Sequence, residues 1–266
     1  MRLAPTAGWT IDLLELCVLE MPAETVAPDG GAEPPFVEAV NVLLLQRPEL
    51  TLLIDTGPGI LGSWFLDLRS DLPGALAAAG SSPEDVDAIV LTHLHFDHVG
   101  GLFEGTWPDE MTIRFPSARV TILAEATAAA RALDPAEPLN AATRAVAAME
   151  AEDRLVEAAH GDSPAHGVAI RSTPGHHPGH ATVEIEGENP LVFLGDIIHH
   201  PVHAEHPVWC RVFDADPQTA LATRLTLLDE LTGRGVRVVA PHLRSPSVGR
   251  FERAGDAYRW VELIDS

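Results

Sequence analysis

The stretch Thr92-His93-Leu94-His95-Phe96-Asp97-His98-Val99-Gly100-Gly101 holds four residues that can bind a transition metal within six positions, directly after the apolar run from Val86 to Leu91. Because alternate residues of an extended segment share a face, His93 and His95 can converge on one point if the strand ends near Thr92. The turn that follows would direct Asp97 and His98 toward a second, nearby point. Imidazole suits zinc and similar divalent ions, and a carboxylate adds an oxygen ligand. The stretch therefore predicts half of a metal site.

The composition predicts a globular protein that does not bind other polyanions. The chain has 266 residues, 46% of them hydrophobic, which is enough to bury a substantial core. Its formal net charge is −22, and all 17 basic residues are arginine. Such a surface repels phosphate backbones and anionic membranes, so we expect neither nucleic acid nor membrane as a partner.

The cysteines and the N-terminus bear on the cellular compartment. Cys17 and Cys210 are far apart in sequence and form neither a disulfide framework nor a zinc motif, which fits a reducing setting. Residues 1–9 lack the apolar run of a signal peptide, and no segment approaches ~20 apolar residues. We therefore expect a cytoplasmic protein whose partner is a small-molecule substrate, with a homodimer left open as its assembly.

Apolar runs and turn residues predict the elements around this stretch. The predicted strands are 11–20, 37–46, 51–55, 86–91, 119–123, 155–157, 167–172, 181–186, 191–194 and 236–240. The predicted helices are 72–79, 124–133, 141–150 and 217–231, the last ended by Gly233, with a further helix starting at 81–84 and an exposed link over 22–35. Strands clustered in each half predict one domain, residues 1–266, with helices packed outside stacked sheets.

Three further segments place histidine or aspartate at predicted strand ends, where loops carry site residues on a rigid scaffold. They are TPGHHPGH at 173–180, FLGD at 193–196 and APH at 240–242. Asp55 also follows a strand, and it can be a surface turn residue or a buried carboxylate that holds a neighbouring loop. These segments are the candidates for the missing half of the site.

Together with LIDTG at 53–57, these motifs resemble those of the metallo-β-lactamase superfamily, in the family's order and over most of the chain. The resemblance implies an α/β fold, a four-layer αββα sandwich of two mixed β-sheets with helices on the outer faces. It also implies a dinuclear site. One metal would be held by His93, His95 and His176, the other by Asp97, His98 and His242, and Asp196 would bridge them.

The stretches 199–217 and 242–251 resemble those of small-molecule hydrolases in this superfamily, the branch of methyl parathion hydrolase-like enzymes and lactonases. That resemblance implies hydrolysis of a lactone or other small ester by a hydroxide that bridges two divalent metals. Zinc is the metal we expect, with iron or manganese as alternatives. The chain has His177 where the family's motif usually has threonine or serine, and its only tyrosine is Tyr258.

Individual roles can be assigned on the same basis. We expect Asp97 and Asp196 to be catalytic, with Asp97 accepting and delivering a proton. His199, His200 and Trp107 are the candidates for substrate binding, although ordinary loop or core packing explains them equally well. The alternative functions are phosphotriester or β-lactam hydrolysis at the same site, or a non-catalytic, metal-binding regulatory protein.

Overall fold

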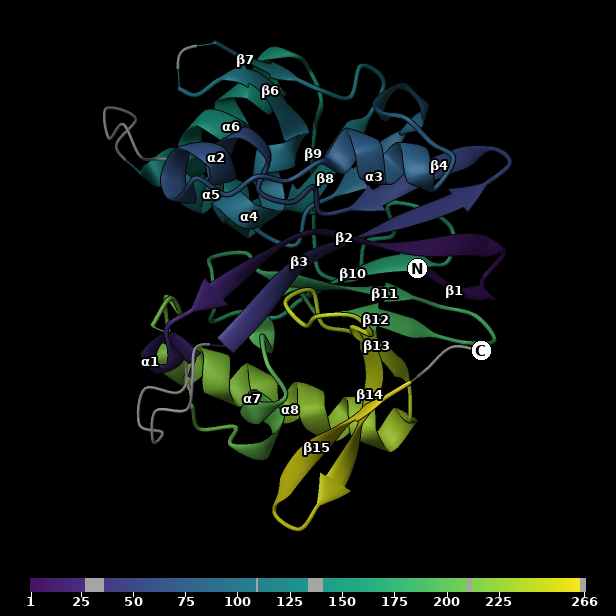
Figure 1. Ribbon diagram of the computed structural model, residues 1–266, viewed down its shortest axis with the longest axis vertical. Coiled ribbons are helices and arrows are strands. Elements are labelled where there is room, and N and C mark those ends of the chain that lie inside the picture. The colour runs from purple at the N-terminus through teal and green to yellow at the C-terminus, as the bar shows by residue number, and fades with distance from the viewer. Residues whose placement is uncertain (27–35, 109, 134–140, 210–211, 264–266) are drawn as a thin grey trace.

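Two β-sheets lie face to face in the middle of the molecule, and helices cover their outer faces (Figure 1). The structure is a computed structural model that describes residues 1–26, 36–108, 110–133, 141–209 and 212–263. This arrangement confirms the predicted fold class of two mixed sheets with outer helices. The prediction that residues 1–266 form one domain stays a prediction.

The first sheet has seven strands in the order β1-β2-β3-β4-β5-β8-β9. The strands from β1 to β4 pair antiparallel, and β4, β5, β8 and β9 pair parallel. Their bounds are β1 Arg2–Thr6, β2 Trp9–Met21, β3 Phe36–Arg47, β4 Leu50–Ile54, β5 Ala88–Val90, β8 Arg119–Leu123 and β9 Leu155–Ala158. The parallel strands bring the loops that follow β4 and β5 to the same edge of the sheet.

The second sheet has six strands in the order β10-β11-β12-β13-β14-β15, with only β12 and β13 pairing parallel. Their bounds are β10 Val168–Ser172, β11 Ala181–Ile185, β12 Leu191–Phe193, β13 Arg237–Val239, β14 Val248–Ala254 and β15 Ala257–Glu262. A separate hairpin joins β6 (Phe103–Thr106) to β7 (Glu110–Ile113). The loops after β10, β12 and β13 carry the distant sequence motifs.

The helices divide between the two outer faces (Figure 1). Above the first sheet lie α2 (Gly59–Leu66), α3 (Leu72–Ala78), α4 (Phe96–Val99), α5 (Ala124–Ala132) and α6 (Ala141–Ala151). Below the second lie α7 (Val202–Glu205) and α8 (Pro217–Arg234), with α1 (Ala23–Val26) close by. Three 3-10 turns complete the elements: η1 Pro83–Asp85, η2 Gly100–Leu102 and η3 Gly195–Ile197.

Three apolar clusters correspond to the three interfaces between these four layers. Side chains of both sheets, such as Trp9, Ile11, Phe193 and Val239, form the cluster between the sheets. A second cluster joins the first sheet to α2–α6, and a third joins the second sheet to α8. Full burial of one such large apolar side chain contributes about 1.5–3 kcal/mol, so the clusters fix the framework that holds the loops.

The structure differs from the predicted elements at several points, and the helices α2, α4 and α7 were not predicted. Helix α8 continues through Gly233 to Arg234, and Gly235 is the left-handed C-cap with φ 60°. The helix-start signals at 81–84 produce only the 3-10 turn η1, in which the N–H and the hydroxyl of Ser82 donate to the carboxylate of Asp85. Strands β1, β6, β7, β14 and β15 were not predicted from the apolar pattern. Within the expected link 22–35, residues 23–26 form α1, and 27–35 lie outside the described residues.

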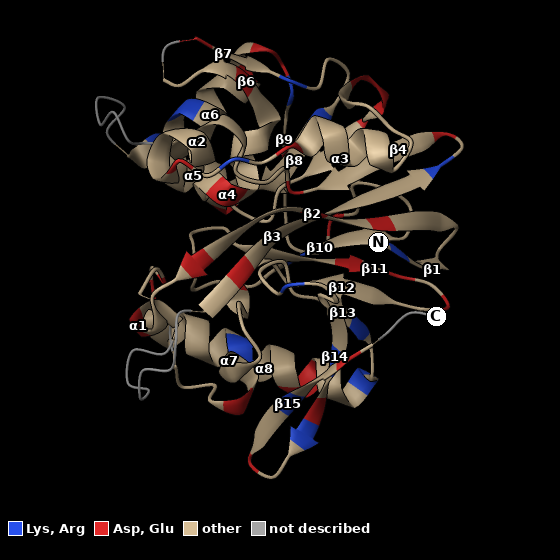
Figure 2. Ribbon diagram, in the orientation of Figure 1, with Lys and Arg blue, Asp and Glu red and all other residues tan. Residues whose placement is uncertain are grey.

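The charge of the chain is spread over both halves, with acidic residues in β2 and β3 on the left of the view (Figure 2). In the ranges that the structure describes, no helix has the length and apolar character needed to cross a bilayer.

Candidate metal centre

The first-half ligand segment runs from the end of β5 into α4. Thr92 is fixed between the sheets, since its carbonyl accepts a hydrogen bond of 2.9 Å from the Ala181 N–H of β11. His95 is the N-cap of α4, so the chain turns there and directs Asp97 and His98 back toward the strand end. A Cβ atom at Gly100 or Gly101 would collide with the backbone of Pro58 or Thr56. The two glycines therefore allow α4 to pack directly on the loop after β4.

Asp55 proves to be a buried carboxylate, so the surface-turn alternative is wrong. It is 1% exposed and has φ 59°. Its Oδ1 accepts from the Thr92 N–H, and its Oδ2 accepts from the Thr92 hydroxyl and from Nδ1 of His98, all at 2.8 Å. One side chain thereby sets the position of the loop and the ring orientation of His98.

The second half of the chain brings His176, Asp196 and His242 to the same place from three loops. His176 Nδ1 lies 2.8 Å from Oδ1 of Asp214, and His242 Nδ1 lies 2.9 Å from the Ala39 carbonyl oxygen. The backbone N–H of Asp196 donates to Nε2 of His180 at 2.8 Å. Each of the three candidate ligands is thus held by a contact outside the cluster, and His180 orders Asp196 as well as its own loop.

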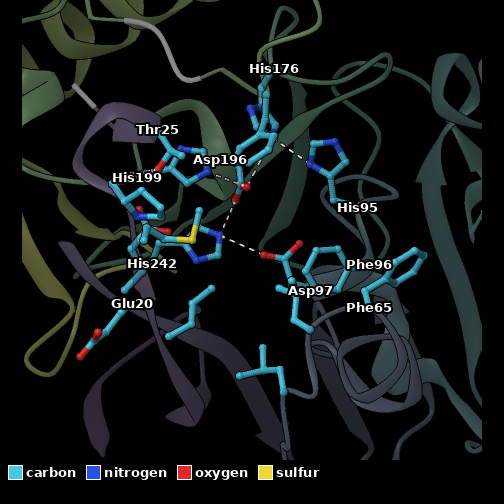
Figure 3. A pocket seen from close by; sticks show the side chains of 17 residues that line it. Glu20, Thr25, Phe65, His95, Phe96, Asp97, His176, Asp196, His199 and His242 are labelled. Atoms are coloured by element: carbon cyan, nitrogen blue, oxygen red, sulfur yellow. Dashed lines mark hydrogen bonds and ion pairs between the residues drawn. The ribbon is translucent and has the colours of Figure 1, made fainter. Parts of the chain in front are cut away.

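The seven candidate ligands form two groups that share Asp196. Figure 3 shows the five of them that line the cavity: His95, Asp97, His176, Asp196 and His242. The first group is His93, His95, His176 and Asp196, the second is Asp97, His98, Asp196 and His242, and the ligand atoms in each lie within 4.8 Å of one another. In the second group, Asp196 Oδ1 is 3.0 Å from His98 Nε2 and 3.1 Å from His242 Nε2. Asp196 Oδ2 faces the first group, 3.4 Å from His176 Nε2.

The chemistry of the inward-facing nitrogens fits divalent metals. Nδ1–H of His98, His176 and His242 faces a carboxylate or carbonyl oxygen, which leaves Nε2 with a lone pair directed inward. Nδ1 of His95 is 3.0 Å from Nε2 of both His93 and His176. Zinc-to-nitrogen bonds of ~2.0–2.1 Å place two ligand nitrogens about this far apart. Lone pairs that converge in this way are expected around a cation.

The pKa shifts differ among the candidate ligands, and the first group contains both directions, since Asp196 and Asp214 outweigh burial and raise the pKa of His176. Burial, together with the neighbouring His98, holds the pKa of His93 well below its usual value, so this ring is neutral and ready to ligate. Burial opposes the charged form of His242, but Asp196 and Asp97 outweigh it and raise its pKa to about 9. For Asp196, burial is outweighed by His98 and His242, which hold its pKa well below the usual range. Metal binding to the second group would therefore release protons.

A cavity of about 790 Å³ opens onto the shared edge of both groups. Its floor includes His95, Asp97, His176, Asp196 and His242, and most of its wall is apolar, formed by Leu19, Met21, Phe65, Leu66, Leu68, Phe96 and Phe213. Two carboxylates, Glu20 and Glu38, also line it. Among the described lining residues there is no arginine, so the wall outside the ligand cluster offers no guanidinium to an anionic ligand.

The structure distributes the three predicted substrate-binding residues differently. His199 lines the cavity, and its Nε2 lies 2.8 Å from Asp196 Oδ2. His200 packs edge-on against Phe36, with ring centroids 4.6 Å apart, and lines a separate depression of about 250 Å³. Trp107 is 5% exposed within the apolar cluster of the first sheet, behind Phe65. His200 and Trp107 are therefore not among the cavity-lining residues.

Two supporting residues, Asp214 and Arg224, were missed by the sequence reasoning. Both side chains are fully buried, and Asp214 orients His176. The sequence Asp-Ala-Asp directly before Pro217 could have indicated Asp214. Asp216 alone is sufficient to cap α8, so the second aspartate in this short segment needs another role. Arg224 lies on a helix whose pattern gives no reason to bury a charge.

The chain matches known families and structures over most of its length. Residues 35–242 match the family model of the metallo-beta-lactamase superfamily. The curated protein "Probable metallo-hydrolase Rv2300c" of Mycobacterium tuberculosis (strain ATCC 25618 / H37Rv) is 31% identical over 191 residues, which are 60% of this chain and 57% of that protein. The chain thus spans little more than half the length of this relative.

Two solved structures have closely similar folds. One is AidC, described as a dizinc quorum-quenching lactonase in complex with a product, with a TM-score of 0.87, 22% identity, and coverage of 99% of this chain and 97% of AidC. The other is AbOPH, described as a hydrolase in the beta lactamase superfamily, with a TM-score of 0.85, 26% identity and the same coverage of 99% and 97%.

Proposed function

The chain belongs to the metallo-beta-lactamase superfamily, and we propose that it is a dimetal hydrolase of an uncharged small-molecule lactone or other ester. The observation that carries this proposal is the position of the cavity, whose floor is the shared edge of the two ligand groups and whose wall is mostly apolar. A small molecule in the cavity would therefore meet the ligand cluster directly.

The ligand groups define which residues would hold metal ions. His93, His95 and His176 would hold one ion, Asp97, His98 and His242 the other, and Asp196 both. Zinc is the metal that we expect here, with iron or manganese as alternatives. Two such divalent ions, when bound, would lower the pKa of a water molecule and polarise a carbonyl oxygen.

The protein's own side chains would handle the protons. The Asp97 side chain is 18% exposed and lines the cavity, whereas that of Asp196 is 3% exposed. We assign to Asp97 the acceptance of a proton from the attacking water and its delivery to the leaving alkoxide. His199 would hold the bridging carboxylate at the cavity wall, where it can also contact substrate.

The apolar wall favours a substrate with a hydrocarbon chain. Leu66 and Phe213 line the cavity and are still 56% and 50% exposed, so they stand at its mouth. Each additional methylene buried against such a wall contributes at most about 0.8 kcal/mol. Four more methylenes would therefore improve kcat/KM by up to about 200-fold.

Phosphotriester hydrolysis is the second candidate, because a phosphotriester is also uncharged and fits the same wall. A β-lactam antibiotic carries a carboxylate, for which the described lining residues provide no arginine. A non-catalytic, metal-binding role would need no cavity that opens on the ligands. The open, mostly apolar cavity, with carboxylates but no arginine among its described lining residues, thus ranks lactone or ester first, phosphotriester second and β-lactam third.

A substrate panel with metal-free controls tests this order. We expect kcat/KM to be highest for acylated γ-lactones, to rise with chain length, to be lower for paraoxon and lowest for nitrocefin. Removal of metal by a chelator should abolish every activity.

Leu66→Ser should reduce the advantage of the long-chain lactone. Trp64→Ser is the matched control, since Trp64 lies on the same helix, is 48% exposed and does not line the cavity. Hydrolysis of nitrocefin alone, or equal rates with and without metal, would contradict the proposal.

A further inference from the structure

A fully buried arginine, Arg224 of α8, lies behind the second-half ligands and has no part in the chemistry proposed above. Its exposed fraction is 0%. Nε donates to the Ile197 carbonyl at 2.9 Å, and Nη1 donates to the carbonyls of Pro207 at 3.0 Å and Trp209 at 2.6 Å. Nη2 lies 3.5 Å from Oδ2 of Asp214. One guanidinium thus joins a helix of the outer layer to four residues that precede it in the chain, three through their carbonyls and one through its carboxylate.

The contact with Asp214 reaches the first ligand group. The Asp214 side chain is also fully buried, and its other oxygen, Oδ1, accepts from Nδ1–H of His176 at 2.8 Å. A carboxylate removed from water is costly unless a positive charge and hydrogen bonds compensate it. Arg224 supplies the charge, and the carboxylate in turn fixes the orientation of His176.

The contact with Ile197 reaches the bridging ligand. Ile197 follows Asp196 directly in the turn η3. Because the carbonyl of the neighbouring residue is fixed by Nε of Arg224, the turn that presents Asp196 is tied to the same guanidinium. Asp196 and His176 are 20 positions apart in sequence, and Arg224 is the group that contacts the support of each.

Other contacts hold α8 itself in register with the His176 loop. The Thr223 hydroxyl donates to the Pro174 carbonyl at 2.7 Å, and the Asp216 N–H donates to the Gly175 carbonyl at 2.9 Å. Gly175 has φ 125°, and a Cβ there would collide with the backbone of Ala220. The position of Arg224 is therefore determined relative to the ligand loops.

We propose that Arg224 is a positioning residue of the metal centre, which fixes His176 through Asp214 and the turn of Asp196 through Ile197, and thereby sets the metal affinity of the first ligand group. The inference rests on the proposed metal binding. Lysine cannot replace arginine here, because a single ammonium group cannot reach acceptors that lie around a planar guanidinium.

Titration of the metal-free protein with Co²⁺, followed by visible absorption and by competition with a chelator, tests the proposal. Wild type should take up about two Co²⁺ per chain. In Arg224→Lys, one of the two should bind about 10–100-fold more weakly, with an altered ligand-field spectrum for that ion, while the other, which shares only Asp196 with the first ligand group, should weaken less. Arg234→Lys is the matched control, an exposed arginine on the same helix that pairs with Glu184 at 2.9 Å, and should match wild type.

Asp214→Asn provides the second variant. It keeps the shape and an oxygen that accepts from His176 but removes the charge, so it should fold even if Arg224→Lys does not, and it should weaken the same Co²⁺. Loss of melting temperature with unchanged affinity for both ions in these variants would overturn the inference and show a structural role only. Failure of the wild type to take up Co²⁺ would instead overturn the proposed function on which the inference depends.

Discussion

The first half of the chain supplies four candidate ligands from one segment, His93 to His98, whereas the second half supplies three from three separate loops. The first segment is held by one buried carboxylate, Asp55, and by glycines that let α4 pack on the neighbouring loop. The three second-half loops are not continuous in sequence. Arg224 of α8 contacts the supports of His176 and Asp196, and the Ala39 carbonyl of β3 holds His242. Ligands from one segment thus share one support, whereas the dispersed ligands depend on contacts from two other elements.

Asp196→Ala should have the largest effect, because it removes the residue that both halves share. Its two oxygens face different ligand groups, so we expect loss of both metals and a fall in kcat/KM of more than about 100-fold. Metal analysis and steady-state kinetics measure both. Asp97→Ala is the comparison variant and should weaken the second group only; unchanged metal content in Asp196→Ala would refute the bridging role.

Asp55→Ala tests the first half alone and should rank next. It leaves the Thr92 N–H, the Thr92 hydroxyl and the His98 Nδ1–H without their buried acceptor. Each buried unsatisfied group costs about 1–3 kcal/mol, so the free energy of unfolding should fall by ~3 kcal/mol or more. Metal affinity at the second ligand group should fall about 10–100-fold.

Denaturant unfolding and Co²⁺ titration provide the two measurements for Asp55→Ala. The control is Asp87→Ala, because Asp87 accepts a hydrogen bond from the Thr51 N–H near the opposite end of β4, at an exposed site. Its Co²⁺ binding should equal that of wild type. Retention of wild-type affinity in Asp55→Ala would show that the segment His93 to His98 holds its shape unaided.

The smallest effects are expected from two glycines at the end of α8. Gly235 has φ 60° as the C-cap, so Gly235→Ala should lower the free energy of unfolding by about 1 kcal/mol. Gly233 lies inside the helix with open space around its Cα, so Gly233→Ala should raise it by about 0.5–1 kcal/mol. Chemical denaturation measures both, and metal content should not change in either. Equal signs for the two substitutions would contradict the observed helix end.

The ligands could be predicted from sequence because each stands at the end of a recognisable apolar strand. The motifs around His93, His176, Asp196 and His242 identify the candidate ligands, and the structure brings all seven of them together. The fold class followed from the same motifs. The strand pattern alone did not reveal β14 and β15, whose alternation of arginine and glutamate, as in the Arg250 to Glu252 pair, hides the apolar face.

Of the supports, only Asp55 was anticipated, as one of two alternatives, because each support is a contact between segments far apart in sequence. The Ala39 carbonyl that contacts Nδ1 of His242 is 203 positions away in sequence. Every residue has a backbone carbonyl, so the sequence cannot indicate which one His242 contacts. The predicted end of α8, residue 231, was wrong by three residues, since both Gly233 and Gly235 are suitable terminators and only the tertiary packing selects one. The residues that line the cavity are equally hard to predict from sequence, because they too depend on tertiary packing. Of two adjacent histidines, His199 lines the cavity and His200 does not.

The metal content of the protein purified without chelators tests the central claim most directly. Two ligand groups that share Asp196 predict about two divalent ions per chain by inductively coupled plasma analysis, with activity lost on their removal and restored on their return. A metal-free preparation with full hydrolytic activity would contradict the account.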